Sequence, residues 1–176
     1  LQAVLDMRGV LRVPLAIATK SSAYGIVRAR RAGCHVEIVP KNWREKSKRL
    51  AAEEWIETLL LKHKVSWIFL AGFMWILSEG FIERWKGRII NIHPSLLPSY
   101  KGKDGFGDAL KAGEKDVGVT LHDVTFDLDA GPNLLQRKFE VPDVQDINRS
   151  RLYLHIQENR ILTHFLRGKW RYRQMS

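Results

Sequence analysis

Asn91-Ile92-His93-Pro94-Ser95-Leu96-Leu97-Pro98 is the stretch that decides how the rest of this 176-residue chain is interpreted. It follows an apolar run typical of a buried strand, and Asp127-Leu128-Asp129-Ala130-Gly131-Pro132 follows a later run of the same kind. An amide, an imidazole and a carboxylate on loops at strand ends can hold an oxyanion and move a proton near neutral pH. The pattern therefore predicts a catalytic site in which Asn91, His93 and Asp129 meet.

Apolar runs alternate with amphipathic segments along the whole chain. We expect strands at 13–19, 35–39, 65–71, 88–92, 117–124 and 133–141, with an edge strand at 170–173. We expect helices at 1–7, 44–62, 73–85, 106–112 and 148–167. A further helix is expected to be capped by Ser21 or Ser22 and to end at Gly33. Alternating strands and helices indicate parallel pairing, and the late pair of strands indicates an antiparallel edge. The prediction is one α/β domain over residues 1–176 with an open, mostly parallel, Rossmann-like sheet whose ligands bind at strand ends.

Composition narrows the class of protein. Hydrophobic residues make up 45% and charged residues 27%, which is typical of a globular protein. No apolar run approaches the roughly 20 residues that span a bilayer, so no membrane partner is expected. The single Cys34 excludes an internal disulfide, and a cytoplasmic location is expected. The scattered histidines lack the spacing of metal ligands, so no metal site is expected.

Together with Leu70-Ala71-Gly72-Phe73-Met74, the two loop motifs resemble the glycinamide ribonucleotide formyltransferase family. The resemblance implies transfer of a formyl group from 10-formyltetrahydrofolate to the amine of glycinamide ribonucleotide, in de novo purine biosynthesis and without a metal. In that reaction Asn91 would donate to the oxyanion, and His93 would act as imidazolium donor or general acid. Asp129 would favour the charged imidazole and relay protons through a water. Leu97–Pro98 would be a cis peptide.

The resemblance also assigns binding residues. The folate side would consist of Trp75, Ile76, Leu77, Val124, Asp127 and Leu128. The substrate side would consist of Pro94, Ser95 and Glu158. Trp75 stands where the family usually has a basic residue, which is a departure from its pattern. His122 is interpreted as a structural partner, and residues 101–107 as a mobile segment that covers the substrates.

The family begins with a strand and a Gly-rich phosphate loop, whereas this chain starts at Leu1-Gln2-Ala3. We therefore expect an N-terminally truncated domain that lacks the first strand and is poorly soluble or partly unfolded alone. A version extended upstream by an apolar strand and a Gly-rich loop is expected to fold and to bind glycinamide ribonucleotide.

Other functions stay open at this point. One is a formyltetrahydrofolate hydrolase or an aminoacyl-tRNA formyltransferase with the same fold, and another is a non-catalytic folate-binding or nucleic-acid-binding protein. The net charge of +10, concentrated at 41–49 and 160–173, suits a nucleic-acid surface, a field that attracts phosphorylated and polyglutamylated ligands, or solvated helix faces. Because no nucleic-acid-binding motif accompanies the charge, nucleic acid is not expected as a partner. Small-molecule substrates and a monomer or homodimer are expected.

Overall fold

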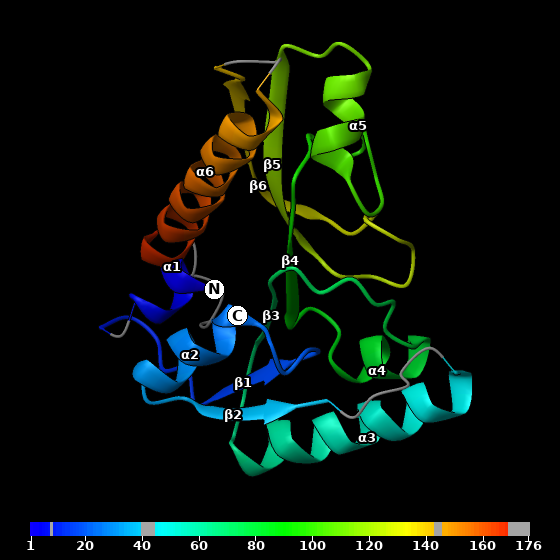
Figure 1. Cartoon of the computed structure of the whole chain (residues 1–176). Helices are drawn as coiled ribbons and strands as arrows, with labels where there is room; N and C mark the ends of the chain where they lie inside the picture. Colours follow the sequence, from blue (N-terminus) through cyan, green and yellow to red (C-terminus); the bar gives the residue numbers. More distant parts are fainter. Residues whose placement is uncertain (8, 40–44, 143–145, 169–176) are drawn as a thin grey trace.

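The computed structural model describes residues 1–7, 9–39, 45–142 and 146–168 (Figure 1). Its helices are α1 (Gln2–Leu5), α2 (Tyr24–Arg31), α3 (Lys46–Lys62), α4 (Glu79–Arg84), α5 (Gly105–Lys111) and α6 (Ile147–Arg167). Its strands are β1 (Leu15–Ala18), β2 (His35–Ile38), β3 (Ile68–Leu70), β4 (Ile89–His93), β5 (Asp116–Asp123) and β6 (Asn133–Glu140). The expected order of strands and helices is confirmed, while the edge strand expected at 170–173 lies outside the described residues.

The strands form two sheets. β1 and β2 pair in parallel, and a second sheet has the order β3-β4-β5-β6. In the second sheet β3 and β4 are parallel, and β5 and β6 add the antiparallel edge that the sequence predicts. The expected single sheet is interrupted between β1 and β3, because no strand in the described part of the chain pairs with both. Both strands are apolar yet only partly buried, as strands with one neighbour are.

Two large apolar cores hold most of the described sheets and helices together, and a third, smaller cluster joins Leu5 of α1 to Ala29 of α2. One large core surrounds β5, against which α5 and α6 both pack (Figure 1). From α6 it takes Leu154, Ile161 and Phe165, whose spacing places them on one helix face. The other core joins α3 and α4 to the strands, with Ile56, Phe81 and others in it. Each fully buried side chain of this size contributes about 1.5–3 kcal/mol.

Two expected helix starts are wrong. The helix expected at 73–85 begins only at Glu79, because Ser78 caps it: the Ser78 hydroxyl accepts a hydrogen bond from the Phe81 N–H at 3.3 Å. Residues 71–78 form a loop in which Gly72 has a φ of 64°. Likewise α2 follows Ala23 without a side-chain cap, so neither Ser21 nor Ser22 has the expected role. The Leu97–Pro98 peptide is cis, as predicted.

Candidate active site

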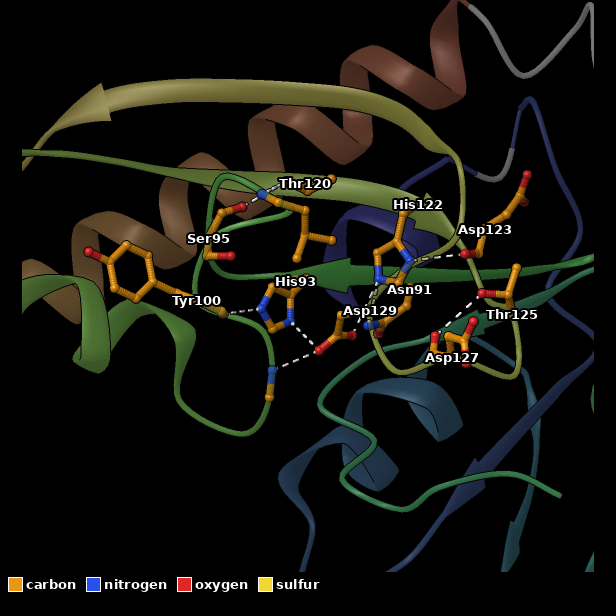
Figure 2. Close-up of polar contacts among 12 residues, drawn as sticks. Asn91, His93, Ser95, Tyr100, Thr120, His122, Asp123, Thr125, Asp127 and Asp129 are labelled. Carbon is orange, nitrogen blue, oxygen red and sulfur yellow. Dashed lines mark hydrogen bonds and ion pairs between the residues drawn. The ribbon is translucent and has the colours of Figure 1, made fainter. Parts of the chain in front are cut away.

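Neighbouring strands β4 and β5 carry three polar side chains of the site, those of Asn91, His93 and His122. Asn91 and His93 are two residues apart on β4, so their side chains lie on the same face of the sheet. Across the antiparallel ladder, Asn91 lies opposite His122 and His93 lies opposite Thr120. Strand register therefore brings an amide and two imidazoles together (Figure 2).

Asp129 joins them from the loop between β5 and β6, where its φ is 48°. Its Oδ2 lies 3.5 Å from Nδ1 of His93, and its Oδ1 lies 3.7 Å from Nε2 of His122. The Gly102 N–H donates a hydrogen bond to Oδ2 at 2.9 Å. All three side chains are buried, with exposed fractions of 4% for His93, 3% for His122 and 8% for Asp129. The structure thus brings together the three residues that the motifs single out, and adds His122.

His122 orients Asn91. A carbonyl can only accept, so the contact of 2.9 Å between His122 Nδ1 and the Asp123 oxygen assigns the ring proton to Nδ1. Nε2 then accepts a hydrogen bond from the Asn91 amide at 3.2 Å. Burial lowers the pKa of His122, which keeps the ring in the neutral form that this bond requires. One amide N–H of Asn91 is held by this bond, and the other can serve an oxyanion.

His93 lies between two oxygen acceptors. Its Nε2 lies 2.8 Å from the Tyr100 carbonyl oxygen, and its Nδ1 faces Asp129. A protonated ring can donate toward both. Gly102, which belongs to the segment expected to cover the substrates, donates to Asp129, and Tyr100, whose carbonyl lies next to His93, immediately precedes that segment.

The loop after His93 is fixed by hydrogen bonds to its backbone. The Ser95 hydroxyl donates to the Ser99 carbonyl at 2.6 Å. The Thr120 hydroxyl donates to the Ser95 carbonyl at 2.7 Å and accepts from the Leu97 N–H at 3.2 Å. Because the hydroxyl proton of Ser95 is used within the loop, this side chain positions the loop. The substrate contacts expected from Pro94 and Ser95 stay predictions.

The residues predicted for a folate side lie on two neighbouring loops. Trp75, Leu77 and Val124 belong to one apolar cluster. Ile76 and Leu77 line a cavity of about 430 Å³ together with Phe126. Asp127 forms the turn, where its carbonyl accepts from the Thr125 hydroxyl at 3.3 Å, and Leu128 is exposed. The two loops are therefore adjacent, as their predicted common role requires.

Glu158 lies apart from this group. Within the described residues its hydrogen bonds and ion pairs go to His155, whose Nδ1 is 2.8 Å from Glu158 Oε2 on the same helix. Its role toward the substrate stays a prediction.

In the described ranges, no three His, Cys, Asp or Glu side chains are grouped to bind a metal ion. None of the described helices is long and apolar enough to cross a membrane.

The class of protein follows from comparison with known families. The model of the family described as Formyl transferase matches residues 5–166. The chain therefore belongs to the formyl transferase family, and the resemblance seen in its motifs is confirmed.

Two relatives show the extent of the sequence similarity. The chain is 36% identical to phosphoribosylglycinamide formyltransferase of Escherichia coli, over 80% of this chain and 68% of that protein. It is 35% identical to the human trifunctional purine biosynthetic protein adenosine-3, over 80% of this chain but only 14% of that protein. The chain thus spans a small part of that longer relative.

Solved structures agree with these relatives. Glycinamide ribonucleotide transformylase 1 from Symbiobacterium toebii superposes with a TM-score of 0.86 at 34% identity, covering 94% of this chain and 79% of that one. A formyltetrahydrofolate deformylase from Pseudomonas syringae has a TM-score of 0.82 at 25% identity, covering 96% of this chain and 56% of that one. Both activities therefore occur on closely similar folds.

Proposed function

We propose that the chain transfers the formyl group of 10-formyltetrahydrofolate to the amino group of glycinamide ribonucleotide, as a step of purine biosynthesis in the cytoplasm. The observation that carries the proposal is the buried pair of His93 and Asp129, 3.5 Å apart, beside an Asn91 amide held by His122. The family and the named relatives support the same reaction.

The protein must stabilise an oxyanion, accept a proton from the attacking nitrogen and return a proton to the leaving nitrogen. The substrate amine attacks the formyl carbon, forming a C–N bond and a tetrahedral intermediate with an oxyanion. The free amide N–H of Asn91 would donate to that oxygen, which is worth about 2.7–4 kcal/mol for one such donor, and the positive charge of a protonated His93 would add to its stabilisation. Asp129, through a water, would take the proton that the attacking nitrogen loses.

Collapse of the intermediate completes the transfer. The bond between the formyl carbon and N10 of the folate breaks, its electron pair stays on N10, and a proton delivered through His93 makes N10 neutral. The products are formylated glycinamide ribonucleotide and tetrahydrofolate. A net charge of +10 suits the phosphate and carboxylates of these ligands, because a positive field raises the local concentration of anions. Both partners are small molecules, and a monomer or homodimer suffices.

The test measures tetrahydrofolate release by the 176-residue chain and by the form extended upstream, with and without glycinamide ribonucleotide. Release that depends on glycinamide ribonucleotide supports the proposal. Release without it would identify a hydrolase, and release that depends instead on aminoacyl-tRNA would identify a transferase for that acceptor. Folate binding without any turnover, in both forms, would overturn the proposal in favour of a binding protein.

A further inference from the structure

Glu53 is a carboxylate buried in α3, only 1% exposed, and both of its oxygens are bound by one residue. The Ser78 N–H donates to Oε1 at 2.7 Å, and the Ser78 hydroxyl donates to Oε2. Burying a carboxylate is costly unless its oxygens accept hydrogen bonds, and here they do so. Glu53 and Ser78 therefore form a fixed connection between α3 and the end of the 71–78 loop.

The Ser78 hydroxyl acts as both donor and acceptor in this arrangement. Its hydroxyl proton goes to Glu53, while its oxygen accepts from the Phe81 N–H at the start of α4. Two separate donors of Ser78 are directed at the carboxylate, so both the position and the orientation of Ser78 are determined. The loop residues just before it are consequently fixed at one end by Glu53.

The other end of this loop is fixed by the sheet. Leu70, the last residue of β3, pairs with Asn91 in the parallel ladder, so the loop leaves the sheet beside the proposed oxyanion donor. Between these two ends the loop exposes Ile76, 60% exposed, next to the buried Leu77. Ile76 and Leu77 line a cavity of about 430 Å³ with Phe126, which is also 60% exposed, and with Glu53 and Ser78 at its wall.

We propose that Glu53 is a positioning residue for the folate co-substrate. It holds the backbone of residues 75–77 where that backbone and the Ile76 and Phe126 side chains can receive a flat aromatic ring. The inference rests on the proposed function, because it names the folate as the ligand of this loop. It adds a residue at the wall of this cavity that acts on the loop through its two hydrogen bonds from Ser78.

Glu53→Gln removes the negative charge of the Glu53 side chain and one of its two acceptor oxygens, with little change of volume. A glutamine has one acceptor oxygen and an NH₂ group that only donates. It can serve one of the two Ser78 donors, while its NH₂ faces the other, so the loop loses its fixed position. Ser78→Ala removes the hydroxyl, which donates to Glu53 and accepts from the Phe81 N–H, and keeps the bond from the backbone N–H to Glu53.

The experiment compares steady-state kinetics of the wild type with Glu53→Gln, Ser78→Ala and the double variant. Glu53→Gln is expected to raise KM for 10-formyltetrahydrofolate about tenfold, with kcat and KM for glycinamide ribonucleotide within about twofold. Ser78→Ala should shift the same KM in the same direction but less. The double variant should be little worse than Glu53→Gln, because both changes remove one shared contact. Glu83→Gln, an exposed carboxylate on α4 paired with Lys86, is the control and should leave all constants unchanged.

A purely structural role makes a different prediction. Glu53→Gln would then lower the melting temperature and leave KM of the folded protein unchanged, and that result would overturn the inference, as would an equal loss of kcat. If Glu53→Gln does not fold, the KM of Ser78→Ala decides. If the wild type transfers no formyl group, the proposed function fails. The positioning role is then tested by calorimetric binding of 5-formyltetrahydrofolate to the same variants. That role predicts weaker binding for the changes at residues 53 and 78 and unchanged binding for Glu83→Gln.

Discussion

Asn91 on β4 and His122 on β5 face each other across an antiparallel ladder, with the Asn91 amide donating to His122 Nε2 at 3.2 Å. The bond requires a neutral His122, and burial lowers the pKa of this ring. The orientation of the proposed oxyanion donor is thereby linked to the protonation of a residue that takes no direct part in the chemistry.

His93→Ala is expected to reduce kcat by a factor of about 10² to 10⁴ while KM for the folate changes little, because the ring acts mainly on the transition state. The measurement is the rate of formyl transfer at saturating substrates. His35→Ala, which removes an exposed imidazole on β2, is the matched control and should keep wild-type kinetics. A parallel loss of folate affinity and turnover in His93→Ala would indicate a structural role instead.

The lowered pKa of His122 predicts a stability that depends on pH. In the unfolded chain this ring binds a proton near its ordinary pKa of about 6.5, whereas the folded ring resists protonation. The unfolded state therefore gains protons as pH falls through this range, and the free energy of unfolding decreases. The contribution is fully present above that pKa.

Urea unfolding at several pH values between about 5 and 8 measures this effect in the wild type and in His122→Asn. The variant should show a smaller loss of stability on acidification, since the other titrating groups are common to both proteins. It should also lose kcat, because Asn91 is no longer held by the ring. Identical pH slopes in the two proteins would contradict the prediction.

Gly105→Ala is expected to displace His93. A Cβ built at this position would lie 2.8 Å from His93 Nε2 and 2.5 Å from the Tyr100 carbonyl oxygen, closer than such atoms approach. A catalytic group displaced by about 1 Å can cost roughly 10² in rate, and that is the loss we expect in kcat. Gly9→Ala, where an added Cβ meets nothing within 4 Å, is the control. Wild-type kcat in Gly105→Ala would show that the contact with His93 is dispensable.

The interruption between the two sheets predicts uneven protection of backbone amides. β5 is paired on both sides, by β4 and β6, whereas β1 pairs with β2 alone in the described part of the chain. Amides of β1 should therefore exchange hydrogen for deuterium at least about tenfold faster than those of β5, because local opening costs less free energy there. Mass spectrometry of peptides from the two strands measures this. Equal protection of β1 and β5 would contradict the prediction.

The sequence by itself determined the order of strands and helices, the antiparallel edge and the motif residues Asn91, His93 and Asp129. These features depend on local patterns: apolar periodicity, loop residues at strand ends and the composition of the His93 loop. It did not determine where the helix after β3 begins, because the Ser78 cap is combined with a bond to Glu53 from a distant helix.

Tertiary structure alone decided the environment of the site. His122 meets Asn91 through strand register, which joins residues far apart in sequence, so its importance could not be read from neighbouring residues. The requirement for glycine at 105 arises because the start of α5 approaches His93 and leaves no room for a Cβ. Both features depend on distances between separate elements, and such distances are set only when the elements pack.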